Sequence, residues 1–220
     1  GGAAGGPRWC LTGAQGERGA AGGRRARAGL AAVGFGGSTP IAKNIDGTGT
    51  AHGKRVQAMG GAKNHALVLP DADVEMAADA VVSAAYGSAG ERCMALSVAV
   101  AVGDVADPLV DAIGARLPKL TIGDGTHPDT DRGPMITAEH RDKVASYINA
   151  GARQGATLVV DGRAEDVPAD GFFLGTTLLD HVTPEMTVYT DEIFGPVLCV
   201  VRVETYEQGL ALINDNPYAN

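Results

Sequence analysis

The sequence predicts an α/β fold with a largely parallel sheet. Short apolar segments of strand character alternate with segments of helical periodicity from residue 33 to residue 216, and this order places helices against a parallel sheet. The composition is that of a globular protein, with 45% hydrophobic and 20% charged residues among 220. A chain of this length can form one large domain or two smaller ones.

Residues 1–32 differ from the rest of the chain. Ten are glycine, nine alanine and five arginine, so the segment has little apolar surface to offset the entropy lost on ordering. A flexible basic arm is one interpretation. We favour a disordered or wrong-frame segment, or the irregular start of a fragment.

Between residues 33 and 68 the pattern predicts a strand, a helix and two further strands. The strand at 33–36 leads into a Gly-Gly-Ser-Thr turn, and a helix begins near Ser38 or Thr39. Two short strands then flank Gly60 and Gly61.

The following segment has the apolar spacing of an amphipathic helix, with Asp71 or Asp73 as its N-cap. Further helices are expected at 106–116 and 137–155, the latter with Gly151 near its end. The apolar stripe of the first helix consists of Val74, Ala77, Ala78, Val81, Val82 and Ala85, and that of the last of Val144, Tyr147 and Ile148.

Strands are expected at 97–103, 156–162 and 195–203, where apolar and β-branched residues cluster. The last predicted element is a helix at 204–216, with Tyr206, Leu210 and Ile213 on one face.

Charge and cysteine content exclude several classes of function. The net charge of −8 argues against a nucleic-acid or anionic-membrane partner. No segment approaches the ~20 apolar residues of a membrane span, and the N-terminus lacks a signal-peptide pattern. Three widely separated cysteines, Cys10, Cys93 and Cys199, favour a reducing compartment such as the cytoplasm over a disulfide framework or a zinc site.

Cys93, in "AYGSAGERCMALS", has two interpretations. Free cysteine is among the most buried residue types, and Cys199, within an apolar strand pattern, is expected in the core. Cys93 instead follows Gly87, Gly90 and Arg92. Those glycines would let the backbone approach a substrate, and the arginine with a helix start would stabilise a thiolate. The alternative for Arg92 is a solvated surface charge.

Two further clusters carry candidate chemistry. In "FGGSTP", at 35–40, two glycines and a hydroxyl pair at a helix start suit a phosphate, although such turns are commonly just turns. In "YTDEIFGPVL", Asp191 and Glu192 precede a core strand. They are either a solvent-facing pair or a holder for the hydroxyl groups of a cofactor sugar.

The order and spacing of "FGGST", "GGAKNH", "GERCM" and "DEIFGPV" resemble the aldehyde dehydrogenase superfamily across residues 33–220. The detail is most similar to its CoA-acylating, NAD-dependent methylmalonate-semialdehyde branch. The resemblance implies the end of a Rossmann-like NAD-binding domain at 33–57 and a parallel-sheet catalytic domain at 58–220. Both domains are then expected to be incomplete, with residues 1–32 atypical.

The resemblance also implies roles for individual residues. Cys93 is the nucleophile that forms a thiohemiacetal and then a thioester. Gly37 and Ser38 contact the cofactor pyrophosphate, Glu192 binds the nicotinamide ribose, and Phe194 packs nearby. Arg92 suits a carboxylate anchor, because a guanidinium offers a bidentate, permanently charged fork.

Ala58 is an informative departure from the family pattern. Hydrolytic relatives carry a glutamate there, which activates water, and loss of a positioned base costs on the order of 10²–10⁴-fold. Its absence favours coenzyme A as the acyl acceptor.

The expected function is therefore oxidation of malonate or methylmalonate semialdehyde to acetyl- or propionyl-CoA, with NAD as cofactor, no metal, and a homo-oligomeric complete enzyme. Two alternatives stay open. One is a hydrolytic aldehyde dehydrogenase, and the other is a non-catalytic fragment that associates with full-length subunits.

Overall fold

The computed structural model describes residues 29–218, which divide after Gly61 into two compact units. Unit 1 ends at Gly61, and unit 2 begins at Ala62. The predicted boundary after residue 57 falls inside a strand that the structure keeps whole in unit 1. The expectation for residues 1–28 lies outside the described residues.

The described part of unit 1, residues 29–61, forms a strand–helix–strand motif. Strands β1 (Ala32–Gly36) and β2 (Arg55–Met59) pair in parallel, from Ala32 opposite Arg55 to Gly36 opposite Met59. Helix α2 (Thr39–Ala51) connects them, with Ser38 as its N-cap. The predicted helix start is therefore confirmed. A Cβ at Gly49 would lie 2.5 Å from Val56 Cγ2, so glycine lets α2 approach β2 closely.

Unit 2 contains a five-stranded sheet in the order β3-β4-β7-β6-β5. All neighbouring pairs are parallel except β5 and β6, as the largely parallel prediction requires. The strand β6 at residues 177–180 was not predicted. The bounds are β3 Asn64–Val68, β4 Leu96–Val102, β5 Thr157–Val160, β6 Thr177–Asp180 and β7 Val197–Val203.

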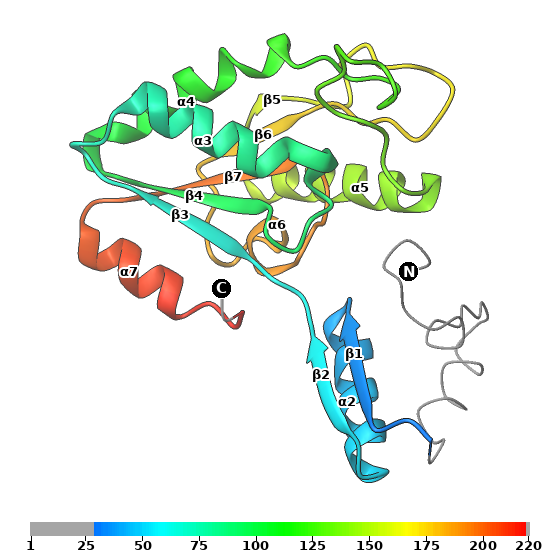
Figure 1. Cartoon of the computed structure of the whole chain (residues 1–220). Helices are drawn as coiled ribbons and strands as arrows, with labels where there is room; N and C mark the ends of the chain where they lie inside the picture. The colour runs from blue at the N-terminus through cyan, green and yellow to red at the C-terminus, as the bar shows by residue number, and fades with distance from the viewer. Residues whose placement is uncertain (1–28, 219–220) are drawn as a thin grey trace. The chain divides into compact units, whose positions relative to one another are not determined.

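Helices cover both faces of this sheet (Figure 1). Helices α3 (Val74–Tyr86) and α4 (Ala106–Gly114) pack on one face. The other face carries α5 (Ala138–Gln154), α6 (Thr187–Thr190) and α7 (Tyr206–Asn214). Short 3₁₀ turns occupy Gly87–Gly90 (η2), Gly103–Val105 (η3) and Leu117–Lys119 (η4).

The alternation of side chains along β4 separates the two cores. Ala99 and Ala101 face the core under α3 and α4, whereas Val98 and Val100 face the core under α5. This is the period of two that a strand imposes. The central strand is therefore apolar on both faces, which explains its continuous apolar sequence.

Helix termini and faces show which expectations were right. Asp73, not Asp71, caps α3 by accepting from the Met76 N–H at 3.1 Å. Gly151 does not end α5 but lies buried within it, and Gly155, at φ 107°, forms the C-cap. Gly151 does lie near the end of the helix, as expected, but the close packing of Val188 and Leu179 requires the glycine at this position.

The buried face of α7 differs from the predicted one. Tyr206 and Leu210 are exposed, while Gly209 is buried. A Cβ at Gly209 would lie 2.6 Å from Leu67 Cδ1, so the helix approaches the sheet on its glycine side.

Within residues 29–218, no helix has the length and apolar character that crossing a membrane requires.

Candidate active site

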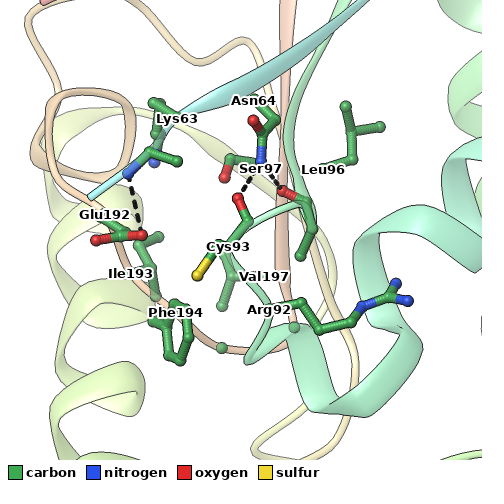
Figure 2. Close-up of a pocket in the computed structure, with 14 residues that line it drawn as sticks. Lys63, Asn64, Arg92, Cys93, Leu96, Ser97, Glu192, Ile193, Phe194 and Val197 are labelled. Carbon is green, nitrogen blue, oxygen red and sulfur yellow. Dashed lines mark hydrogen bonds between the residues drawn. The ribbon is translucent and has the colours of Figure 1, made fainter. Parts of the chain in front are cut away.

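A pocket in unit 2 lies between the turn that precedes β4 and the segment that precedes β7 (Figure 2). It brings together four predicted residues from two distant parts of the chain: Arg92, Cys93, Glu192 and Phe194. The strand β3 and the residues leading into it supply a third wall. The full lining is Ala62, Lys63, Asn64, Gly90, Arg92, Cys93, Ala95, Leu96, Ser97, Glu192, Ile193, Phe194, Gly195 and Val197.

Cys93 lies in the turn between η2 and β4 and is exposed. Figure 2 shows its sulfur directed toward the side of the pocket that carries Ile193 and Phe194. The interpretation of Cys93 as a buried core residue is therefore wrong. Cys199 is fully buried, as expected, and burial raises the pKa of its thiol to about 11.

The glycines before Cys93 accommodate the protein's own atoms. Ser88, Ala89 and Gly90 follow one another in the left-handed region, at φ 52°, 56° and 70°. A Cβ at Gly90 would collide with the carbonyl oxygen of Gly195, and one at Gly87 would lie 2.7 Å from Arg92 Nη2. The glycines thus permit close packing within the protein, and Gly90 also lines the pocket. The expected helix start after Cys93 is wrong, because the chain enters strand β4.

Arg92 points away from the thiol (Figure 2). Its Nη2 donates to the carbonyl oxygens of Ser83 at 3.2 Å and Ala84 at 3.1 Å, in the last turn of α3. A cation is favourable at this end of a helix because the unpaired carbonyls carry partial negative charge. In this arrangement the guanidinium binds the last carbonyl groups of α3 and points away from the Cys93 thiol.

Glu192 lies in a segment that several long side chains hold in place. Its Oε1 accepts from the Ala62 N–H at 3.1 Å. The buried Lys63 donates from Nζ to the carbonyl oxygens of Val188 at 2.8 Å and Asp191 at 2.6 Å. Desolvation lowers the pKa of the Lys63 ammonium, although nearby acidic groups oppose the shift.

Asp191, the neighbouring carboxylate, is a structural partner of helix α5. Its Oδ2 accepts from the Tyr147 hydroxyl at 2.9 Å. Burial and this hydrogen bond raise the pKa of Tyr147 to about 12. Of the two candidate carboxylates, Glu192 alone lines the pocket.

Phe194 has an unusual backbone conformation for a bulky residue, with φ at 57°. Its carbonyl oxygen accepts from His140 Nε2 at 2.6 Å. The two rings also meet edge to face, with centroids 6.3 Å apart. Helix α5 therefore fixes the aromatic residue at the wall of the pocket.

Sequence reasoning assigned no role to Lys63 or Asn64. Asn64 Nδ2 donates to the carbonyl oxygens of Cys93 at 2.9 Å and Ala95 at 2.7 Å, drawn as dashed lines in Figure 2. The available signal was a charged and an amide residue, in "GGAKNH", at the start of an apolar strand.

Gly37 and Ser38 belong to unit 1, at the N-terminus of α2. The Ser38 side chain makes no capping hydrogen bond, so its hydroxyl can serve a ligand together with the helix N–H groups. Thr39 Oγ1, by contrast, accepts from the Gly61 N–H at 2.9 Å. These residues fit a phosphate-bearing cofactor such as a dinucleotide.

Within residues 29–218, no group of histidine, cysteine or acidic side chains has an arrangement that could hold a metal ion.

The described chain is an α/β protein whose exposed cysteine, between a glycine-rich turn and a central parallel strand, shares a pocket with a glutamate. Comparison with known proteins identifies the family. The family model "Aldehyde dehydrogenase family" matches residues 8–220, and the chain belongs to this family. The match includes most of the Gly/Ala/Arg-rich segment, which the resemblance had left out.

Individual relatives show which members of the family this chain is similar to. Malonate-semialdehyde dehydrogenase of Pseudomonas aeruginosa is 57% identical over 192 residues, which cover 86% of this chain and 39% of the relative. The crystal structure of methylmalonate-semialdehyde dehydrogenase from Oceanimonas doudoroffii matches with a TM-score of 0.91 and 53% identity, covering 93% of this chain and 43% of that one.

A second solved structure contains a cofactor. It is a Sinorhizobium meliloti protein described as a methylmalonate-semialdehyde dehydrogenase complexed with NAD, with a TM-score of 0.90, 48% identity, and coverage of 93% of this chain and 42% of that one. This chain thus spans about two fifths of the length of the relatives it matches.

Proposed function

We propose that this protein acts in the NAD-dependent, CoA-acylating oxidation of malonate or methylmalonate semialdehyde to acetyl- or propionyl-CoA. The observation that carries the proposal is the exposed Cys93 thiol in a pocket shared with Glu192 and Phe194. Relatives at 47–57% identity named for malonate semialdehyde support the substrate class.

In this proposal Cys93 performs the covalent chemistry. Its thiolate attacks the aldehyde carbon, and the carbonyl oxygen becomes the oxyanion of a thiohemiacetal. Bound NAD supplies the chemistry of hydride acceptance, and the thiohemiacetal carbon becomes that of a thioester on Cys93. The bond between the α-carbon and the carboxylate then breaks, and the carboxylate leaves as CO₂. The electron pair of that bond stays on the α-carbon, which takes up a proton. The CoA thiolate attacks the thioester, releases acyl-CoA and restores the Cys93 thiolate.

Four residues are assigned to the cofactor. Gly37 and Ser38 offer backbone donors and a hydroxyl to the pyrophosphate, which the free Ser38 side chain at the start of α2 supports. Glu192 accepts hydrogen bonds from the nicotinamide ribose, and Phe194 packs against the same end. The Glu192 carboxylate suits this role because the Ala62 N–H binds Oε1, which leaves Oε2 available.

The assignment of Arg92 as anchor for the substrate carboxylate requires a change of rotamer. The guanidinium would exchange the carbonyl oxygens of Ser83 and Ala84 for a charged partner, which makes the stronger hydrogen bond. Arg92→Leu should then raise KM for the carboxylated semialdehyde far more than for propanal. Equal changes with both substrates would restrict Arg92 to its contact with α3.

The choice of CoA over water rests on Ala58, which offers no carboxylate to activate water. A thiolate needs less assistance than water, because it is intrinsically more nucleophilic.

A homo-oligomeric assembly and a cytoplasmic location, which suits a free thiol nucleophile, complete the proposal.

The deciding experiment measures NADH formation by the purified protein with malonate semialdehyde, with and without CoA, and identifies the product. CoA-dependent turnover that yields acetyl-CoA supports the proposal. CoA-independent turnover that yields the free acid favours the hydrolytic alternative. The alternative from the sequence is association with full-length subunits. Co-purification with such a subunit, without NADH formation by this chain, would favour that role.

A further inference from the structure

Three consecutive residues, Ala62, Lys63 and Asn64, contact both segments that form the pocket. The Ala62 N–H donates to Glu192 Oε1 at 3.1 Å. Asn64 Nδ2 binds the carbonyl oxygens on either side of Met94, those of Cys93 and Ala95, at 2.9 and 2.7 Å (Figure 2). One short segment therefore connects the nucleophile and the carboxylate.

Lys63 contributes the most constrained of these contacts. Only 1% of the residue is exposed, and its Nζ donates to the carbonyl oxygens of Val188 and Asp191, at 2.8 and 2.6 Å. Burying an ammonium is unfavourable unless its donors are paired. The two carbonyls pair two of its three donors, so the position of Lys63 fixes the position of the segment before Glu192.

The extended backbone at the start of strand β3 explains how the neighbouring residues Lys63 and Asn64 contact two different segments. Successive side chains in extended backbone point to opposite sides. Lys63 thus reaches residues 188–191, and Asn64 reaches the turn at 93–95. Any shift of residues 62–64 along the strand would move both segments together.

We propose that Lys63 and Asn64 are positioning residues that fix the Cys93 thiol and the Glu192 carboxylate relative to each other. The roles of Cys93 and Glu192 rest on the proposed function, whereas the two connections rest on the contacts alone. Asn64 holds the cysteine turn, and Lys63 holds the glutamate segment. The two connections are separable by mutation.

Hydrogen exchange in the purified chain tests this separation. Asn64→Leu should accelerate exchange of the Ala95 amide, which bonds to the Arg92 carbonyl, by roughly tenfold or more, because it removes both hydrogen bonds of the Asn64 side chain. Lys63→Met should do the same for the Asp191 amide, which bonds to the Thr187 carbonyl. Each variant should leave the other amide within about twofold of the parent.

The exposed Asn214 and Lys143 provide matched controls in the same unit. Asn214→Leu and Lys143→Met should change neither amide. If Lys63→Met does not fold, Lys63→Gln, which retains a donor, replaces it with the same expected localisation. Equal acceleration of both amides by either variant, or no acceleration by both, overturns the proposal.

A charge variant supplies a readout that a space-filling role would not change. Asn64→Asp places a carboxylate against two carbonyl oxygens and adds negative charge beside Cys93. The rate of Cys93 alkylation at neutral pH should fall by roughly threefold or more, because the added negative charge disfavours the thiolate, while Asn214→Asp leaves the rate unchanged. An unchanged rate in Asn64→Asp overturns the Asn64 assignment. Neither readout uses NAD or aldehyde, so their outcome is independent of whether the proposed reaction occurs.

Discussion

At the scale of single residues, the two described cysteines show how the surroundings of a thiol determine its reactivity. Cys93 is exposed in a turn, whereas Cys199 is fully buried in β7 with Sγ 3.5 Å from the Val188 carbonyl oxygen. Thiolate is the reactive form of cysteine, and burial disfavours it. The two thiols should therefore differ greatly in reactivity.

We expect iodoacetamide to label Cys93 quickly near neutral pH and Cys199 only slowly. Both access and the raised pKa of Cys199, about 11, oppose its reaction, so labelling of Cys199 in the folded protein should stay slow until the solution is strongly alkaline. Peptide mass spectrometry over a pH series provides the measurement, with urea-unfolded protein as the control for equal intrinsic reactivity. Comparable rates for the two thiols in folded protein would contradict the assignment.

The neighbouring residues in the sequence indicated that Cys199 is buried, but they left two interpretations of Cys93 open and did not predict the orientation of Arg92. Cys199 lies within an apolar β-type run, which indicates burial directly. The direction of Arg92 depends on carbonyl groups of Ser83 and Ala84, at the end of a helix that is eight and nine residues away. Such a contact appears only once the turn between them has a known path.

At the scale of elements, the turn at Gly87–Gly90 determines where the nucleophile lies. Three successive residues adopt left-handed backbone, and two of them, Ser88 and Ala89, are not glycine. Such conformations persist where surrounding contacts over-determine them. The backbone of Gly195 packs so closely beside the turn that a Cβ at Gly90 would collide with its carbonyl group.

Gly90→Ala should destabilise unit 2 by about 2–4 kcal/mol, because it adds both a strained φ and a collision with Gly195. Gly125→Ala, where a Cβ meets nothing within 4 Å, is the matched control. Urea unfolding of both variants gives the free energies. A Gly90→Ala protein as stable as the Gly125→Ala protein would show that the turn tolerates a side chain and is not fixed by this contact.

The elements that could be predicted are those with long periodic patterns or clear caps. The stripe of α3 and the apolar run of β7 are examples, since each pattern repeats over several residues. The four-residue β6 and α6 were missed, whereas the equally short β5 was predicted from its apolar, β-branched run. Gly151 was placed correctly near the end of α5, but its packing role could not be predicted, because a glycine required for packing resembles one that ends a helix.

At the scale of the whole molecule, the order of motifs gave more information than any single motif. "FGGST", "GERCM" and "DEIFGPV" are weak separately, but their order and spacing indicated the family that the match over residues 8–220 establishes. Unit 1 contains the proposed pyrophosphate-binding residues, and unit 2 contains the thiol and Glu192. The polar contacts of Lys63 and Asn64 could not be predicted, because they join residues 29 to 128 positions apart.

The proposed choice of acyl acceptor makes a prediction about Ala58. Ala58→Glu should increase CoA-independent NADH turnover and yield the free acid, because a positioned base contributes on the order of 10²–10⁴-fold. Gln57→Glu, which adds the same charge at the neighbouring position in β2, should not. A normal initial burst of NADH without any rise in the CoA-free steady rate would show that residue 58 does not decide the acceptor.

The central claim is that Cys93 carries the acyl group and that CoA removes it. The most direct measurement incubates the protein with malonate semialdehyde and NAD in the absence of CoA, quenches it in acid, and maps the modified peptide by mass spectrometry. The account predicts an acyl thioester on Cys93, absent from a Cys93→Ala variant, which disappears on addition of CoA as acetyl-CoA forms. An acyl group on another residue, or release of the Cys93 adduct as free acid at the same rate with and without CoA, would contradict it.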